Sequence, residues 1–296
     1  MREPGCRDCL VKPRRPRLKA MLSAHKRETG KTEERRRANR APEAPPPCPF
    51  GPSPRGRPRE PSHDRGAGDG PGCRGRGYSC GMAEPALRLF LVRHGESPSN
   101  RELRYLGRRD EPLTEAGVRQ AECLAAALSP LPLAAVYASP LQRAAETGRR
   151  IAAGLGVPLV AEPRLIEQRF GDWEGWTRGE ILDRGGVERE RLLGWERDPD
   201  AAPPGGESLA NVAERLESLL ADLGAAHPGA WVTLVSHVGP IKVLLCAALA
   251  VPLTAARRLF LDPGTLSVID WGESPVIRLF NAHGHLGWRE ARWMRQ

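Results

Sequence analysis

Long apolar runs are missing from this chain of 296 residues. The longest uninterrupted apolar stretch, Val243–Val251, is far shorter than the roughly 20 residues with which a helix crosses a bilayer. The N-terminus also lacks the apolar core of a secretory signal peptide. We therefore expect neither a membrane partner nor export, and the cytoplasm is the predicted location.

Cysteine and tryptophan are scarce and unevenly placed. Five of the seven cysteines fall in the first 81 residues, whereas all seven tryptophans follow residue 82. Cys6 and Cys9 have the spacing of half a zinc site, but no second pair completes it. Cys123 and Cys246 stand alone on helix-like apolar stretches, which is typical of buried thiols in a reducing compartment. We predict neither a disulfide framework nor a metal site.

Excess positive charge is absent from most of the chain, although the sum is +9. Residues 1–81 hold 20 Lys/Arg and 9 Asp/Glu, a net +11, whereas residues 82–296 hold 25 and 27, a net −2. The basic segment also contains 13 Pro and 11 Gly, with too few large apolar side chains to offset the entropy of ordering. We predict a disordered tail over residues 1–81 and one α/β domain over residues 82–296.

Three interpretations of the basic tail compete. The Arg/Gly stretch Gly72–Gly77 resembles segments that bind single-stranded nucleic acid, and a solvated linker is the simpler explanation. We favour a third, in which translation starts at Met82, just before the first convincing strand, so that the tail is not made. We accordingly do not expect a nucleic-acid partner.

Short apolar runs alternate with amphipathic helical stretches from residue 87 onward. Strands are predicted over 87–92, 135–138, 157–161, 231–236, 265–271 and 276–280, and helices over 114–128, 140–153, 208–226 and 240–249. Ser139 is the expected N-cap of the second of these helices. The alternation predicts a three-layer α/β fold whose mostly parallel sheet has helices on both faces and an antiparallel edge strand.

Basic groups gather where predicted strands end. Arg93 and His94 end the first strand, His237 follows the strand 231–236, and Arg143 stands at the start of the helix after the second strand. Ligands bind such sheets beyond the carboxyl ends of the strands. Arginine donates pairs of hydrogen bonds to phosphate oxygens, and a helix N-terminus adds partial positive charge. Each residue alone has an ordinary structural explanation, but together they predict a site for a phosphate dianion.

The segments around these residues resemble the histidine phosphatase superfamily, which includes the cofactor-dependent phosphoglycerate mutases. The shared segments are LVRHGES from residue 91, GRRDEPLTEAG from 107, ASPLQRAAET from 138, EQRFGDWEG from 167, PPGGES from 203 and VSHVGPI from 235. The resemblance covers residues 87–280 in order and does not reach the tail. It is strongest to the acid-phosphatase half of bacterial ribonuclease H/acid phosphatase proteins and to α-ribazole phosphatases.

The resemblance implies a role for each residue. His94 would be the nucleophile that forms a phosphohistidine, and Glu167 would protonate the leaving oxygen. The resemblance also implies that Arg93, Arg143 and His237 stabilise charge in the transition state. The residues implied to contact the substrate are Arg93, Gly95, Asn100, Gly107, Arg143 and His237. No metal and no cofactor is implied. Without the resemblance, Glu167 would be interpreted as a surface partner of Arg164 or Arg169.

Valine at position 238 departs from the family pattern, because most of the superfamily has glycine after the second histidine. Valine resists positive φ. We therefore expect either a conventional turn at Val238 or a different local backbone.

The segment 171–206 bears on the choice between hydrolysis and isomerisation. It carries nine acidic residues against five basic ones. A mutase must hold the carboxylate of a glycerate, and an acidic segment is a poor lid for a small acid. We therefore predict a metal-independent phosphomonoesterase that acts on a small phosphate ester. A phosphoglycerate mutase and a catalytically silent phospho-ligand binding module are the alternatives. The sequence does not identify the leaving group of the ester. It does not determine the oligomeric state either, and a homodimer is one of the possibilities.

Overall fold

The computed structural model describes residues 87–287. The predictions for residues 1–81, including the Cys6/Cys9 pair and the start at Met82, lie outside them. No helix within the described residues is long and apolar enough to cross a membrane. Cys123 is half-buried and Cys246 is buried, and both are free thiols.

A six-stranded mixed sheet forms the centre of the described residues, with the strand order β3-β2-β4-β1-β5-β6. Its strands are β1 (Leu87–Arg93), β2 (Leu133–Ala138), β3 (Leu159–Ala161), β4 (Trp231–Ser236), β5 (Leu266–Trp271) and β6 (Val276–Ala282). The first four run parallel to one another, whereas β5 is antiparallel to β1 and pairs with β6 as a hairpin. The predicted fold class, antiparallel edge and hairpin are confirmed.

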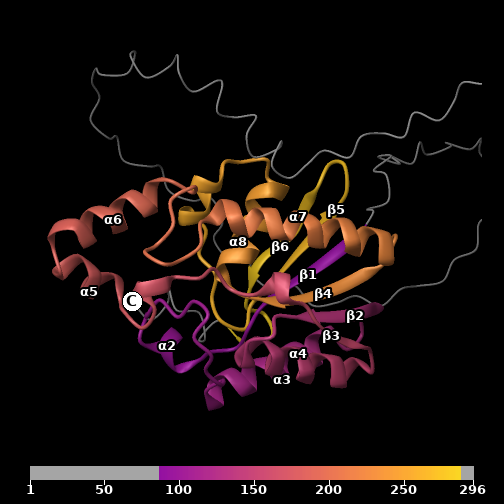
Figure 1. Ribbon diagram of the computed structural model, residues 1–296. Coiled ribbons are helices and arrows are strands. Elements are labelled where there is room, and N and C mark those ends of the chain that lie inside the picture. The colour runs from indigo at the N-terminus through magenta and orange to yellow at the C-terminus, as the bar shows by residue number, and fades with distance from the viewer. Residues whose placement is uncertain (1–86, 288–296) are drawn as a thin grey trace, which may run out of the picture. The chain divides into compact units, whose positions relative to one another are not determined.

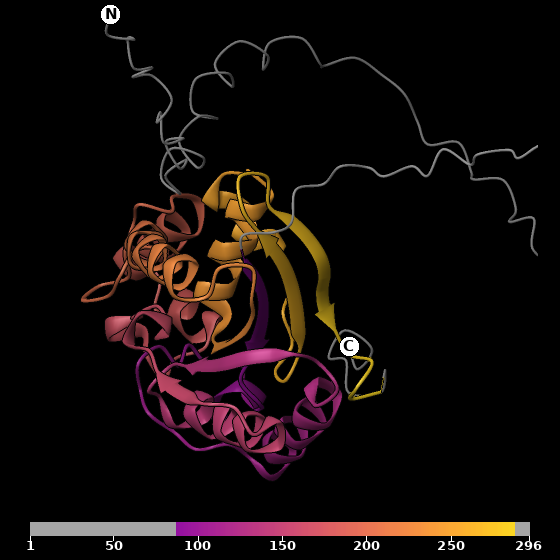
Figure 2. The same ribbon diagram turned by 90° about the vertical axis from the view of Figure 1, so that its right-hand side faces the viewer.

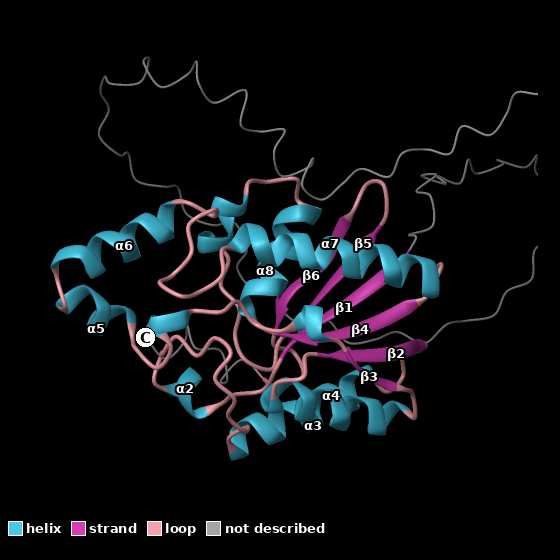
Figure 3. Cartoon of the chain, viewed as in Figure 1, coloured by secondary structure: helices cyan, strands magenta, loops and turns pink. Residues whose placement is uncertain are grey.

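Helices cover both faces of this sheet (Figures 1 and 3). The helices α3 (Glu115–Leu128) and α4 (Gln142–Leu155) lie on one face, and α7 (Leu209–Ala226) and α8 (Val238–Ala248) lie on the other. Figure 2 shows the same two layers from the side, α3 and α4 in magenta below the strands and α7 and α8 in orange.

The strand β1 packs against both helical layers. Leu89 and Leu91 belong to the apolar cluster with α7 and α8, whereas Phe90 and Val92 belong to the cluster with α3 and α4. This division follows from the two-residue repeat of a strand, which turns successive side chains to opposite faces. A central strand that is buried on both faces has a nearly continuous apolar sequence, and β1 could therefore be predicted from the sequence.

A third, smaller apolar cluster lies outside the sheet. It joins the buried side chains Trp173, Ile181, Leu192 and Trp195. These come from the short helices η4 (Gly171–Trp173), α5 (Arg178–Asp183) and α6 (Gly186–Arg197), so the segment 171–206 is largely helical. The remaining short helices are α2 (Pro98–Arg101), η3 (Pro163–Leu165) and η5 (Leu253–Arg258).

Two local expectations are settled by the backbone. The helix α4 begins at Gln142 with Leu141 as N-cap, so the predicted start at Pro140 with a Ser139 cap is wrong. The Ser139 hydroxyl instead lies 2.8 Å from Nε2 of His237. Val238 is the first residue of α8 and is not among the residues with positive φ, so the turn after His237 is conventional.

Candidate active site

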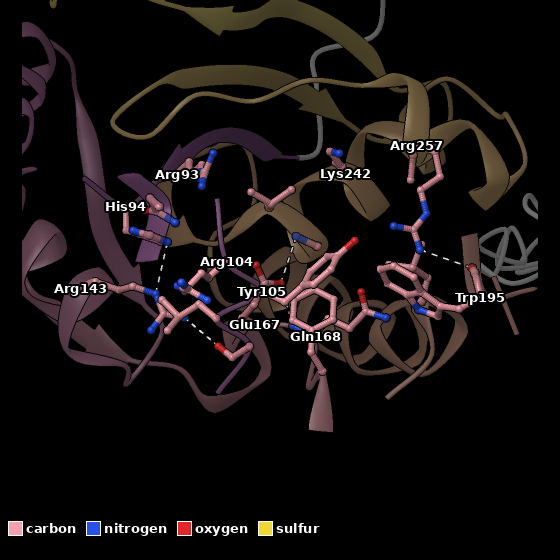
Figure 4. A pocket seen from close by; sticks show the side chains of 18 residues that line it. Arg93, His94, Arg104, Tyr105, Arg143, Glu167, Gln168, Trp195, Lys242 and Arg257 are labelled. Carbon is pink, nitrogen blue, oxygen red and sulfur yellow. Dashed lines mark hydrogen bonds between the residues drawn. The ribbon is translucent and has the colours of Figure 1, made fainter. Parts of the chain in front are cut away.

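A cavity of about 230 Å³ gathers most of the predicted site residues (Figure 4). Six of the eight line it: Arg93, His94, Asn100, Gly107, Arg143 and Glu167. The two that do not line it directly are Gly95 and His237, although the His237 ring lies only 4.9 Å from the ring of His94. The cavity is smaller than the roughly 300–1,000 Å³ of drug-sized ligand sites, which suits a small ester.

The His94 imidazole is oriented by two hydrogen bonds. Nδ1 lies 2.7 Å from the carbonyl oxygen of Gly95, an acceptor, so this nitrogen carries the proton. Nε2 then has the lone pair, and it accepts a hydrogen bond from Nε of Arg143 at 3.3 Å. The tautomer inferred from these contacts presents an unprotonated Nε2 to the cavity, which is the form that a nucleophile requires.

The Arg143 guanidinium is fixed in place while almost fully buried, with 1% of the residue exposed. Its two terminal nitrogens donate to the carbonyl oxygens of Arg109 at 2.9 Å and Gly107 at 2.8 Å. No carboxylate within residues 87–287 forms an ion pair with it. Burial lowers the pKa of Arg143, and Glu167 acts in the opposite direction. Because guanidinium remains charged in proteins, the site holds a buried cation that an anionic ligand would neutralise.

Arg93 and His237 complete the basic end of the cavity. The buried Arg93 side chain donates to the carbonyl oxygen of Leu261, which fixes its direction. His237 is fully buried, and burial together with the charges of Arg143, His94 and Arg93 holds its pKa well below the ordinary value. Its Nδ1 has no hydrogen-bond partner in the described part of the chain. A buried polar atom in that state is costly unless a ligand or water meets it.

The Glu167 carboxyl group is buried in the cavity wall. Its Oε1 accepts hydrogen bonds from the backbone N–H groups of Gln168 at 2.7 Å and Gly239 at 3.1 Å. Burial raises the pKa of Glu167, although these hydrogen bonds and the charges of Arg143 and Arg93 act against the rise. The surface salt bridge with Arg164 or Arg169 that the sequence alone suggests is therefore wrong: Arg164 pairs with Glu162 and Asp222.

The remaining predicted residues are Asn100, Gly107 and Gly95, of which the first two line the cavity. Asn100 is buried and its Oδ1 accepts a hydrogen bond from the backbone of Ser97. Gly107 has a left-handed φ of +57°, and its carbonyl oxygen faces Arg143. Gly95 does not have positive φ, so a left-handed turn is not why glycine stands there. A Cβ at Gly95 would overlap the carbonyl oxygen of Gly117 in α3.

Sequence reasoning missed several residues that build this cavity. Thr147 in α4 accepts a hydrogen bond from the Gly95 backbone and donates to the Arg143 carbonyl oxygen one turn earlier, so it links the loop after β1 to α4. Gly239 brings its backbone N–H to Glu167, where a Cβ would clash with the carboxylate. Thr147 lies in the segment ASPLQRAAET and Gly239 in the segment VSHVGPI. Their place in these shared segments is the sequence feature that could have indicated a role in the site. Lys242 and Arg257 also line the cavity, and nothing in the sequence pointed to them.

No group of three or more His, Cys, Asp or Glu that could hold a metal ion occurs over residues 87–287. The prediction that neither metal nor cofactor takes part stays a prediction.

Comparison with known proteins assigns the family. The model of the histidine phosphatase superfamily (branch 1) matches residues 89–282. The bifunctional protein Rv2228c of Mycobacterium tuberculosis is 39% identical over 203 residues, 67% of this chain and 55% of that protein. The chain thus spans about half the length of that relative. Phosphoserine phosphatase 1 of Hydrogenobacter thermophilus is 36% identical over 203 residues, 68% of this chain and 95% of that protein.

A solved structure agrees with this assignment. The α-ribazole phosphatase of Shigella flexneri is 30% identical and superimposes with a TM-score of 0.59, covering 66% of this chain and 96% of that chain. The fold and the relatedness inferred from the sequence motifs are therefore confirmed together.

Replacing Gly95 with alanine tests the close packing behind His94. We expect Gly95→Ala to lower the free energy of unfolding by about 1–3 kcal/mol, because the new Cβ overlaps a backbone oxygen that cannot move aside easily. The matched control is Gly194→Ala in α6, where a Cβ meets nothing within 4 Å. That change should stabilise by up to about 1 kcal/mol through helix propensity. Urea unfolding measures both. Equal effects of the two substitutions would contradict the packing argument.

The depressed pKa of His237 makes stability depend on pH. The unfolded chain binds a proton near pH 6.5 that the folded chain does not, so stability is lost as pH falls below that value. We expect a contribution of up to about 1.4 kcal/mol per pH unit. Urea unfolding at pH 7.5, 6.5 and 5.5 in phosphate-free buffer measures it. His237→Gln should flatten the decline relative to the unmodified chain, and parallel curves would rule the effect out.

Proposed function

The chain belongs to the histidine phosphatase superfamily, and we propose that it hydrolyses a small phosphate monoester through a phosphohistidine on His94. The observation that carries the proposal is the orientation of the His94 ring. Gly95 holds the proton on Nδ1, and Nε2 meets the cavity beside the buried Arg143 guanidinium. A lone pair and a fixed cation at one point suit attack on a phosphorus atom.

In the first step the Nε2 lone pair of His94 attacks phosphorus, and the bond from phosphorus to the ester oxygen breaks. The electron pair of that bond moves to the leaving oxygen, which takes the proton of Glu167. In the second step the Glu167 carboxylate removes a proton from water, and the water oxygen attacks phosphorus. The P–N bond breaks, its electron pair returns to Nε2, and inorganic phosphate leaves.

Charge stabilisation would come from the basic end of the cavity. Phosphoryl transfer spreads negative charge over three equatorial oxygens, and catalysis depends mainly on cations fixed beside them. Arg143 is held by two carbonyl oxygens and Arg93 by a third, so neither must reorganise when charge develops. His237 would supply a further hydrogen bond.

Glu167 suits the role of proton donor because burial favours its neutral form. A general acid works best when its pKa is raised toward the operating pH. The backbone N–H groups of Gln168 and Gly239 keep the same oxygen oriented in the carboxylate form, which the second step requires.

Removing the nucleophile tests the proposal. Using the full-length chain with p-nitrophenyl phosphate and a chelator, we expect release of inorganic phosphate and a loss of about 10³-fold or more in His94→Ala. Alkaline quenching during turnover, followed by intact-mass measurement, should show a phosphorylated chain that His94→Ala lacks. Unchanged turnover in the variant would refute the assignment. Conversion of a monophosphoglycerate to its isomer without phosphate release would favour the mutase, and binding without turnover would favour a silent module.

The leaving group distinguishes the contribution of Glu167. Glu167→Gln should lower kcat/KM by about 10²–10⁴-fold for an alkyl phosphate, whose alkoxide needs a proton, and by less for an aryl phosphate. With the alkyl ester, kcat/KM of the unmodified chain should fall as pH rises through the raised pKa of Glu167, because the acid form is lost. Equal losses for both esters would place Glu167 outside proton transfer.

A further inference from the structure

The cavity continues well beyond the groups that act on the phosphate. Arg257, Trp195 and Lys242 line the part of the cavity that lies away from His94 and Arg143 (Figure 4). The aromatic side chains of Tyr105 and Phe170 line the space as well. The hydrolysis proposed above uses none of these residues.

Helix α8 places Lys242 in the cavity wall. Gly239 contacts Glu167, and Lys242 follows three residues later, on the same face of the helix. It is the only lysine after residue 31 in a chain that otherwise uses arginine. No carboxylate of residues 87–287 forms an ion pair with its ammonium group.

Lys242 lies in a cationic environment. Burial, together with the charges of Arg257 and Arg93, lowers the pKa of Lys242 to about 8, and Glu167 acts in the opposite direction. Bringing a buried cation near other cations is unfavourable unless an anion joins them.

Arg257 reaches the same end of the cavity from η5. Its guanidinium lies 3.5 Å from the ring centroid of Trp195 and donates to the Trp195 carbonyl oxygen at 3.4 Å. Stacking on the indole fixes the plane of the guanidinium. No carboxylate in the described part of the chain pairs with it either.

No acidic residue of segment 171–206 lines the cavity, although the charge of Glu196 partly offsets the lowering of the Arg257 pKa by burial. Glu180 pairs with Arg104, and Glu196 accepts two hydrogen bonds from Arg178. The single carboxyl group among the lining residues is Glu167. The expectation that this segment is a poor lid for a small acid stays a prediction, although none of its acidic residues lines the cavity.

We propose that Lys242 and Arg257 form a subsite for a carboxylate carried by the leaving alcohol, so that the substrate is a small phosphate ester of a hydroxy acid. This inference rests on the proposed hydrolysis for its biological meaning, but not for its test. The two anionic ends of such an ester would each meet a pair of cations, Arg93 and Arg143 at one end and Lys242 and Arg257 at the other. Glu167 would lie between them, beside the ester oxygen that it protonates.

Binding by a chain that cannot turn over measures the subsite directly. The probes are 3-phosphoglycerate and glycerol 3-phosphate, which share a carbon skeleton and differ in a carboxylate against a hydroxymethyl group. Isothermal titration calorimetry of full-length His94→Ala should show 3-phosphoglycerate binding about tenfold more tightly or better. Adding Lys242→Met or Arg257→Gln should reduce this ratio to about threefold or less. Arg258→Gln is the matched control, because its exposed side chain does not line the cavity, and it should keep the ratio.

The outcomes separate the two proposals. Equal binding of both esters to His94→Ala, or a ratio that survives both Lys242→Met and Arg257→Gln, overturns the subsite. If Lys242→Met shows no cooperative melting transition, the binding ratio of Arg257→Gln decides the test, because Arg257 is exposed and its substitution should not prevent folding. In the active chain the ratio of kcat/KM values for the two esters should follow the binding ratio. Hydrolysis of both esters without preference for the carboxylate would overturn the subsite alone. Absence of hydrolysis of any ester would overturn the proposed function, and the binding ratio would then decide the subsite.

Discussion

The buried charge of Arg143 is the constraint on which the site depends. A guanidinium without a paired carboxylate is tolerated because the carbonyl oxygens of Gly107 and Arg109 accept its protons. Those carbonyls can face it because residue 107 is a glycine with positive φ. The same guanidinium donates to His94 and so fixes which ring nitrogen carries the lone pair. The backbone at Gly107, the Arg143 cation and the His94 ring therefore form one linked arrangement.

The sheet brings these parts together by topology. The strand β1 delivers Arg93 and His94, and its parallel neighbour β4 delivers His237, with registered pairing that ends at Arg93 and Ser236. His94 and His237, 143 positions apart in the sequence, thus meet at one edge of the sheet. The close approach of Gly95 to Gly117 and the hydrogen bond from Gly95 to Thr147 tie this edge to α3 and α4.

Much of this could be predicted from the sequence, for identifiable reasons. The strand β1 is a near-continuous apolar run, and Thr114 and Ser208 are N-caps as their side chains suggest. The burial of Glu167 could not be predicted, because an acidic residue flanked by arginines has the same local pattern as a surface ion pair. The position of Lys242 in the cavity wall could not be predicted for a related reason. Lys242 lies in an apolar helix, and residue spacing alone does not show which face of that helix meets a cavity. Ser139 was misplaced because a serine before proline is typical of a helix cap, whereas its hydroxyl here meets His237.

The third apolar cluster supports one wall of the cavity independently of the sheet. Trp195, which stacks against Arg257, belongs to that cluster and not to either core beneath the sheet. Its stability is therefore supplied locally, by α5, α6 and η4. Substitutions there would reshape the cavity wall beside Arg257 without disturbing the two core clusters that flank β1. Under the proposed function, recognition of the leaving alcohol and chemistry at His94 therefore depend on separate hydrophobic units.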